Sequence, residues 1–296
     1  RQHQLSNQPL TKRSKRTRKN AAPFSWALWA SRRTQLNWHE WTAALGKAVN
    51  SQIEACFIEH EDGRWDENII TADILRALKK LHKDPIKVGN IYRSTSWNAY
   101  KLKGLSEQTH GDIALIVKIH LEPGKTVEGV AFLEAKRITH GGTTSSGSFS
   151  SIKWGRLKAY SESSPAHYTI LYDYLPVKEQ NIPLCRSMVT THLLALNKKD
   201  RSIYKHSENI SELLGYRLLM GHGLDYREPV VASAAGFTDS DIKYKYVVTA
   251  DVVVTPSLDN IIDMTPVVIN NEKYGDIDSP DIKLKPRNDS GPSFSP

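Results

Sequence analysis

The chain has 296 residues, of which 39% are hydrophobic and 24% charged, and its formal net charge is +8. This length accommodates one large domain or two modest ones, each able to bury a hydrophobic core. No apolar run is long enough to span a bilayer and no signal-peptide pattern opens the sequence, so we expect no membrane partner. Cys56 and Cys185 lie far apart without a CxxC neighbour, which argues against a zinc site or a disulfide framework and predicts a cytoplasmic protein.

The positive charge is concentrated at the start of the chain. The first 20 residues contain seven Lys or Arg and no Asp or Glu; removing these seven from the total of 40 leaves 33 basic residues against 32 acidic ones. Residues 1–22 are therefore predicted to form a basic, disordered arm. Two interpretations of this arm stay open: it binds phosphates without sequence preference, or it is simply a solvated extension.

Two helices are predicted in the first part of the chain. Residues 33–61 carry apolar side chains at steps of three and four, with Thr34 as a plausible cap. A second, shorter helix is predicted over 71–82 and ends before Pro85. Residues 86–100 are rich in β-branched and aromatic side chains, which predicts an extended segment.

The central part of the chain predicts a strand that begins near Asp112, a short turn EPGKT, and a second strand that closes with Glu134-Ala135-Lys136. Side chains two apart in a strand point to the same side, so Glu134 and Lys136 share a face. If the two strands form a hairpin, the start of the first lies beside the end of the second. Asp112 is then a near neighbour of Glu134 and Lys136.

The elements that follow are a Gly/Ser-rich loop, a helix over 150–163 and a strand over 166–174. The loop is not a phosphate-binding P-loop, because no GK[ST] follows its glycines. Further on, the pattern predicts a helix near 207–220, a buried strand over 243–256 and an irregular tail over about the last 25 residues.

The central stretch resembles the PD-(D/E)xK nuclease superfamily. It has an aspartate, a Glu-x-Lys on the neighbouring strand, and then a helix and a strand. The residues that match are Asp112, Glu134 and Lys136, within the stretch 107–174. The resemblance implies an α/β fold with a central mixed four-stranded sheet flanked by helices, in the restriction-endonuclease-like order αβββαβ. It divides the chain into the arm, a nuclease core over 23–180 and a C-terminal extension over 181–296.

The chemistry of these residues agrees with that resemblance. Hydrolysis of a phosphodiester needs a hard cation, and Mg²⁺, with Mn²⁺ as a substitute, prefers oxygen ligands. Asp112 and Glu134 would supply carboxylates, the Ala135 carbonyl a third oxygen, and Lys136 would orient the attacking water and offset negative charge. The competing interpretation is structural: Glu134 and Lys136 form an ion pair at a strand end, and Asp112 is a turn residue.

Additional site residues are less well defined by the sequence. The superfamily often adds a carboxylate from its first helix, and the candidates here are Glu40, Glu54 and Glu59, with Asn50 where some relatives have a glutamate. Glu107, five residues before Asp112, is another candidate metal ligand; otherwise it is a loop charge.

The helix that follows the Glu-x-Lys strand offers two basic residues, Lys153 and Arg156. Both are candidates to contact the nucleic acid backbone, and both could equally face solvent.

The leading hypothesis is a metal-dependent endonuclease that acts on DNA. The FLEAKR segment and the length of the segment between Asp112 and Glu134 look most like nuclease modules of prokaryotic antiviral defence systems, and DNA mobility is a further role found in the superfamily. Two alternatives stay open. The chain is a non-catalytic nucleic-acid-binding module, or it is a subunit that works only with a partner protein or as a homodimer.

Overall fold

The computed structural model describes residues 36–81, 85–103, 111–122, 124–140, 147–177, 180–238, 244–256 and 265–279. The predicted basic arm and Glu107 lie outside these ranges. The described residues belong to one compact unit.

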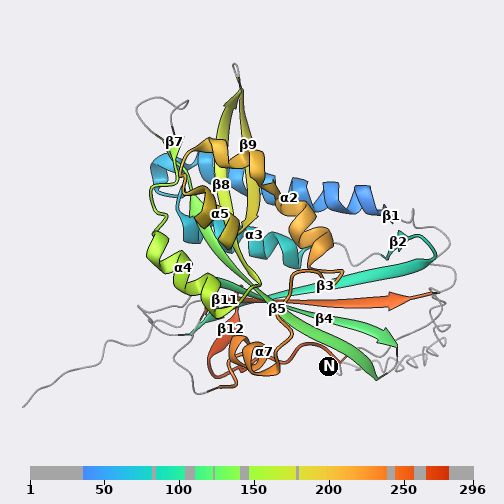
Figure 1. The fold of residues 1–296 in the computed structure, drawn as a ribbon. Helices are drawn as coiled ribbons and strands as arrows, with labels where there is room; N and C mark the ends of the chain where they lie inside the picture. Colours follow the sequence, from blue (N-terminus) through green and yellow to red (C-terminus); the bar gives the residue numbers. More distant parts are fainter. Residues whose placement is uncertain are drawn as a thin grey trace, which may run out of the picture. The chain divides into compact units, whose positions relative to one another are not determined.

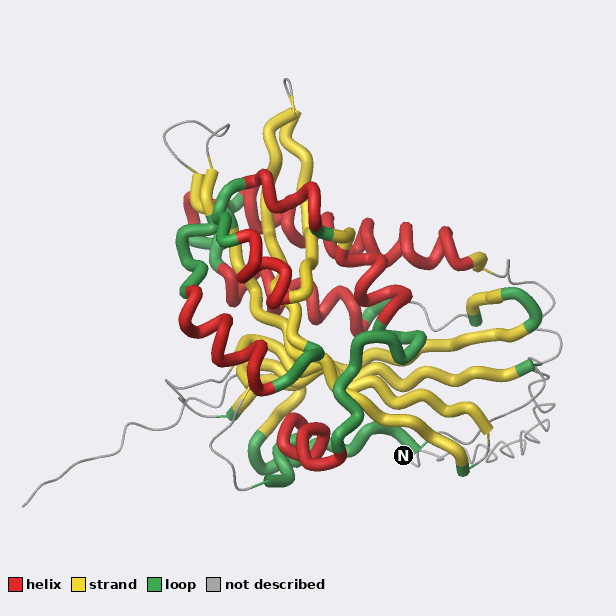
Figure 2. Tube along the Cα trace, in the orientation of Figure 1, coloured by secondary structure: helices red, strands yellow, loops and turns green. Residues whose placement is uncertain are grey.

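One mixed sheet of ten strands dominates the described part of the chain (Figures 1 and 2). Its strands are β1 (Leu36–Asn37), β2 (Ile86–Val88), β3 (Ile91–Leu102), β4 (Gly111–Glu122), β5 (Lys125–Arg137), β8 (His167–Val177), β9 (Gln180–Val189), β10 (Glu208–Asn209), β11 (Tyr244–Thr255) and β12 (Tyr274–Asp276). They follow the order β1-β2-β3-β11-β4-β5-β8-β9-β10, and β12 also pairs with β3. A separate ribbon joins β6 (Thr139–His140) to β7 (Gly147–Ser148).

The helical elements are α2 (Trp38–Ile58), η1 (His60–Asp62), α3 (Glu67–Lys79), α4 (Trp154–Ser163), α5 (Thr190–Leu196), η2 (Arg201–His206), α6 (Ile210–Glu212), η3 (Leu213–Arg217) and α7 (Glu228–Ala234). Helices α2 and α3 cover one face of the sheet and α7 packs on the opposite face (Figure 1). Helices α4 and α5 pack on that opposite face too, through Leu157 and Leu193 against Leu171 of β8.

The α/β class and the mixed sheet predicted from the sequence are confirmed, but the predicted four-stranded core is not, because the sheet is larger. The sheet is larger because strands on both sides of the predicted core pair with it. The extended segment 86–100 is a hairpin of β2 and β3, and the buried strand predicted over 243–256 is β11. Strands β9, β11 and β12 come from the stretch 181–296, so part of the predicted extension builds the sheet.

The first helix shows how capping determines a boundary. Helix α2 begins at Trp38, five residues after the predicted start, because Asn37 forms a capping box with Glu40: Glu40 N donates to Asn37 Oδ1 at 2.9 Å, and Asn37 N donates to Glu40 Oε2 at 2.8 Å. Its predicted apolar stripe is buried in the core, as expected for an amphipathic helix.

The second helix begins earlier than predicted. Helix α3 starts at Glu67, not at residue 71, because the Asp66 side chain accepts a hydrogen bond from Asn68 N at 2.9 Å. This earlier start places Glu67 in the first helical turn.

The helix predicted near 207–220 is confirmed in part, over residues 210–217. That stretch contains β10, the single turn α6 and the π-helical turn η3. Gly215 lies at its centre, where its carbonyl accepts a hydrogen bond from Trp41 Nε1 at 3.2 Å. A Cβ added to Gly215 would lie 3.3 Å from the Leu45 side chain, so a larger residue here would require Leu45 of α2 to shift slightly.

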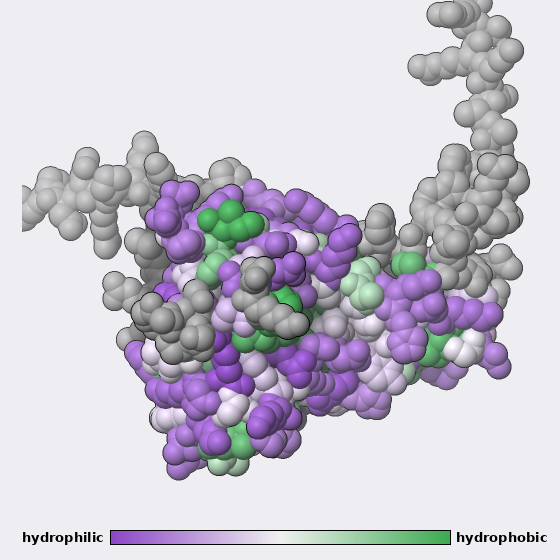
Figure 3. Space-filling model, turned by 90° about the horizontal axis from the view of Figure 1, so that it is seen from above, coloured by the Kyte–Doolittle hydropathy of each residue, from purple (hydrophilic) through white to green (hydrophobic). Residues whose placement is uncertain are grey.

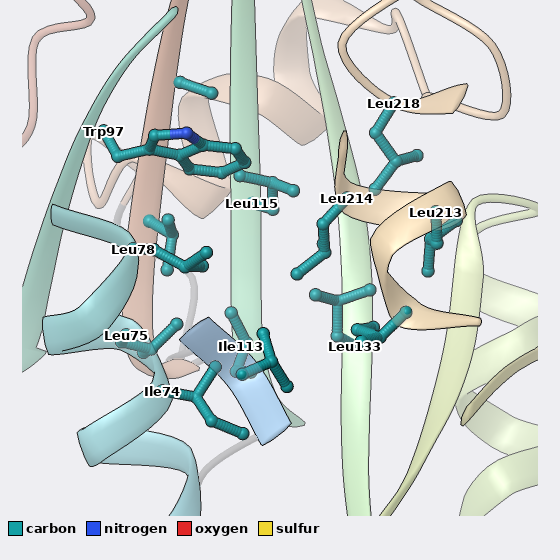
Figure 4. Packing of buried hydrophobic residues seen from close by; sticks show 14 of the residues in the cluster. Ile74, Leu75, Leu78, Trp97, Ile113, Leu115, Leu133, Leu213, Leu214 and Leu218 are labelled. Carbon is teal, nitrogen blue, oxygen red and sulfur yellow. The ribbon is translucent and has the colours of Figure 1, made fainter. Parts of the chain in front are cut away.

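The core lies mainly between the sheet and helices α2 and α3. Strand β4 alternates between two hydrophobic layers: Ile113 and Leu115 face α3, whereas Ala114 and Ile116 pack toward α7. Figure 4 shows Ile113 and Leu115 in the cluster that α3 completes. A strand buried on both faces explains why its sequence is a continuous apolar run.

Strand β11 is central to this arrangement. It pairs antiparallel with β3 and parallel with β4, so it separates two strands that are neighbours in the sequence. Its Val247, Ala250 and Val252 side chains are fully buried. Strand β4, which carries Asp112, therefore depends on residues in the last fifth of the sequence for one of its two pairing partners.

We predict that a chain truncated after residue 238 does not fold cooperatively, because loss of β11 leaves β3 and β4 without their common partner. A chain truncated after residue 279 retains every described strand and serves as the control. Thermal unfolding followed by far-UV circular dichroism distinguishes the two. A cooperative transition of the shorter chain at the temperature of the control would contradict the prediction.

Candidate active site

The pairing of β4 with β5 brings Asp112, Glu134 and Lys136 together. The strands are antiparallel with Ile113 opposite Leu133, so the start of β4 lies beside the end of β5. Ala135 N donates a hydrogen bond to Asp112 Oδ2 at 2.8 Å. Because side chains alternate, these three residues share the face opposite Ile113 and Leu133, which is the face covered by α4.

Lys136 lies buried among oxygen atoms. Its Nζ donates to Glu134 Oε1 at 2.9 Å and to the Ala135 carbonyl at 2.7 Å, and it lies 3.6 Å from Glu67 Oε2. Burial lowers the pKa of Lys136, but the carboxylates of Glu134, Asp112 and Glu67 more than offset this, and the pKa is raised above 10.5. Lys136 is therefore an ammonium at neutral pH and acts as a hydrogen-bond donor.

Glu134 is the most buried carboxylate of the group, with only 2% of its surface exposed. One oxygen, Oε1, contacts Lys136 and lies 3.9 Å from Arg156 Nε. The other, Oε2, is buried and has no hydrogen-bond partner among the described residues. A Cβ added to Gly111 would lie 4.0 Å from this oxygen, so Oε2 faces the start of β4. A buried charged oxygen without a partner is costly, and it marks a place for a cation or a donor.

The environment of Asp112 also penalises its charge. Burial of the carboxyl group, reinforced by the nearby Glu134 carboxylate, raises its pKa from 3.8 to about 7, although Lys136 and the Ala135 N–H act in the opposite direction.

A third carboxylate, Glu67, belongs to the site and is missing from the sequence-based candidates. Besides its approach to Lys136, Glu67 Oε1 accepts hydrogen bonds from Arg137 N at 3.1 Å and from Ser151 Oγ at 2.6 Å. It thus links helix α3, the end of β5 and the segment that precedes α4. The signal in the sequence was Asp66, a typical N-cap residue, which places the helix start next to Glu67.

The carboxylates proposed from the first helix have other surroundings. Glu40 belongs to the capping box of α2, and Glu59 forms an ion pair with Arg64 at 3.1 Å. Glu54 is exposed, and Asn50 is partly exposed on α2. Nothing in the described structure brings these four residues to Asp112 and Glu134.

Lys153 and Arg156 lie at the rim of a pocket above the buried charges. The pocket holds about 520 Å³ of open space, and its lining residues are Glu67, Glu134, Lys136, Ser151, Lys153, Arg156 and Leu157. Lys153 and Arg156 are exposed, and the Arg156 guanidinium also donates to the Tyr160 hydroxyl. The pocket therefore has carboxylates and an ammonium at its base and cationic groups at its mouth.

The oxygen atoms of Asp112, Glu134 and Ala135 suit a hard cation, and Glu134 is the one of the three that lines the pocket. Among the described residues no cluster of three or more His, Cys, Asp or Glu side chains is arranged to hold a metal ion. Mg²⁺, however, is commonly bound by only one or two protein carboxylates together with water and phosphate oxygens. The unpartnered Glu134 Oε2, the nearby Asp112 carboxylate and the Ala135 carbonyl match that chemistry.

We predict that Asp112→Asn stabilises the metal-free protein at pH 8 but not at pH 4. Because the folded-state pKa of Asp112 is raised to about 7, ionising it costs stability that grows above its ordinary value of 3.8 and is complete above pH 7. Asn removes that cost and still accepts the hydrogen bond from Ala135 N. We expect a gain of ~2–4 kcal/mol at pH 8, measured by denaturant unfolding in chelator. Parallel stability profiles of the two proteins from pH 4 to pH 8 would contradict this account.

The chain matches no protein-family model, no curated protein and no solved structure. These comparisons therefore assign it neither a family nor a function. A functional assignment has to be argued from the arrangement of Asp112, Glu134 and Lys136 and of the residues around them.

Proposed function

We propose that the chain is a metal-dependent endonuclease that hydrolyses DNA phosphodiester bonds, with a core of the PD-(D/E)xK type. The observation that carries this proposal is the base of the pocket, where Glu134 has a buried oxygen without a partner beside Asp112 and the Lys136 ammonium. A purely structural ion pair would not require a third carboxylate, Glu67, or an open pocket above it.

The order of elements around the pocket supports the same proposal. If the short strands β2, β6 and β7 are left aside, α3 is followed by β3, β4, β5, α4 and β8, which is the order αβββαβ. Strand β5 runs parallel to β8 with α4 between them in the chain. Strand β11 lies between β3 and β4, so the sheet departs from a simple four-stranded core at that point.

Each residue of the site has a role in the proposed reaction. Asp112, Glu134 and the Ala135 carbonyl would hold Mg²⁺, which supplies charge neutralisation at the phosphate and lowers the pKa of a bound water. Lys136 donates a hydrogen bond to the attacking water or to the phosphate oxygen that gains charge. Lys153 and Arg156 bind phosphate at the mouth of the pocket.

The cellular role is a narrower proposal. The resemblance to nuclease modules of prokaryotic defence systems supports action on foreign or mobile DNA in the cytoplasm, alone, as a homodimer or with a partner subunit.

None of the described helices combines the length and the apolar character needed to cross a membrane. The face seen in Figure 3 is mainly hydrophilic, with small and separate hydrophobic patches where described residues form it.

We predict that wild-type protein nicks or linearises supercoiled plasmid in Mg²⁺ or Mn²⁺ and is inactive in chelator. Glu134→Gln and Lys136→Met, which preserve side-chain volume, should each lower the cleavage rate by at least roughly 10²-fold, because each removes a charge from the reacting centre. Glu54→Gln and Lys80→Met make the same chemical changes at exposed positions and should cleave like wild type.

Cleavage that survives both site substitutions would show that the site is wrong. A wild-type protein that binds DNA but never cleaves it would favour the non-catalytic module. Activity that appears only when a second protein is added would favour the partner-dependent subunit.

We predict that Glu67→Gln lowers the cleavage rate by roughly tenfold without loss of fold, because the amide still accepts hydrogen bonds from Arg137 N and Ser151 but no longer attracts the Lys136 ammonium. Single-turnover cleavage rates beside Glu54→Gln measure the effect. If Glu67→Gln cleaves at the wild-type rate, Glu67 has only a structural role.

A further inference from the structure

A basic surface extends from the mouth of the pocket across α4 and η2. We use the term basic wall for Lys153, Arg156, Lys198, Lys199 and Lys205. Four of these side chains are exposed and Lys199 is partly buried. Lys153 and Arg156 line the pocket itself, so the basic wall is continuous with the proposed site.

Backbone and side-chain contacts hold the segment of Lys198 and Lys199 against the segment that precedes α4. Lys199 Nζ donates to the Ile152 carbonyl at 2.7 Å and lies 5.6 Å from the centre of the Trp154 ring. Phe149 N donates to the Lys199 carbonyl at 2.7 Å. The segment that carries Lys198 and Lys199 is therefore held against the segment that leads to Lys153.

Buried residues hold η2 in place beneath this surface. Ile203 packs with Phe149 and Leu157 in one hydrophobic cluster. The buried Asp173 carboxylate accepts hydrogen bonds from Arg201 at 2.7 and 2.9 Å and from the Tyr204 hydroxyl at 2.8 Å. The basic wall is thus part of a packed, preorganised structure.

Arg156 lies 3.9 Å from Glu134 Oε1, but the other acidic residues of this region neutralise little of the basic wall. Asp173 forms an ion pair with Arg201, and Asp200 caps η2 by accepting a hydrogen bond from Ser202 N at 2.8 Å. Glu162 lies 3.9 Å from Lys158, on the adjacent turn of α4. Among the described residues no carboxylate forms an ion pair with Lys153, Lys198 or Lys205.

The opposite side of the molecule has the reverse charge. Residues 147–206 contain nine Lys or Arg and four Asp or Glu, whereas residues 36–81, which include α2 and α3, contain five Lys or Arg and eight Asp or Glu. The two groups of helices cover opposite faces of the sheet, and Glu67 lies where they meet at the pocket. A polyanion is therefore attracted to one side of the pocket and repelled from the other.

We propose that the phosphate backbone of the nucleic acid substrate lies along the basic wall and reaches the pocket from the side of α4 and η2, not across α2 and α3. This inference rests on the proposed nuclease function and specifies the substrate path. Phosphates that replace condensed counterions contribute most of the affinity of such a surface, and that contribution depends on salt.

The test compares two double substitutions that change the net charge equally. Lys198→Glu/Lys205→Glu reverses charge on the basic wall, and Lys47→Glu/Lys80→Glu reverses it at exposed positions on and next to α2 and α3. Binding of a labelled DNA duplex is measured by fluorescence anisotropy in chelator, which prevents cleavage, over a series of salt concentrations. Thermal unfolding of both variants checks that they fold.

We predict that Lys198→Glu/Lys205→Glu weakens binding by roughly tenfold or more at low salt and makes the slope of log affinity against log salt shallower by about two. The control should keep the wild-type slope and stay within about twofold of its affinity. Equal weakening of both variants would overturn the inference, because it would show an effect of net charge alone.

If the wild-type protein cleaves plasmid and Lys198→Glu/Lys205→Glu binds DNA as tightly as wild type, the substrate path is overturned but the nuclease function stands. A wild-type protein that neither binds nor cleaves DNA would overturn both. If an RNA duplex binds with the same dependence on the basic wall and DNA does not, the path stands and the choice of DNA as substrate fails.

Discussion

The register between β4 and β5 is the constraint on which the candidate site depends. Ile113 lies opposite Leu133, and at the end of the strand pair Ala135 N donates a hydrogen bond to Asp112 Oδ2. A slip of one residue would turn Glu134 and Lys136 into the hydrophobic core beneath α3 and bring Leu133 to the face that carries the charged residues. The apolar side chains that alternate with the charged ones prevent this slip, so the same packing that stabilises the sheet also positions the chemistry.

The site concentrates charge where a folded protein normally avoids it. Three carboxylates, Asp112, Glu134 and Glu67, surround the single buried ammonium of Lys136. Such a cluster of carboxylates lowers the stability of the fold unless a cation neutralises its charge. The packing of the sheet has to offset this loss of stability. Residues selected only for stability would not be expected to leave Glu134 Oε2 buried without a partner.

The sequence predicted local features better than distant ones. Apolar runs on either side of the turn EPGKT identified the two central strands, and helical periodicity identified α2, because each signal lies within a few residues. Glu67 was missed because its importance depends on where α3 begins and on contacts with Arg137 and Ser151, far along the chain. The ten-stranded sheet was missed because pairing between strands far apart in the sequence leaves no periodic signal. The β3–β11 pair, whose partners lie 145 to 163 residues apart, is the clearest case.

The central position of β11 has a consequence for how the chain folds. Strands β3 and β4 are consecutive in the sequence and run antiparallel to each other, since β11 is antiparallel to one and parallel to the other. During synthesis they are complete long before Tyr244 is made, and nothing then prevents them from pairing directly as a hairpin. That hairpin would have to open to admit β11, so we expect a slow refolding phase that reports strand exchange at the centre of the sheet.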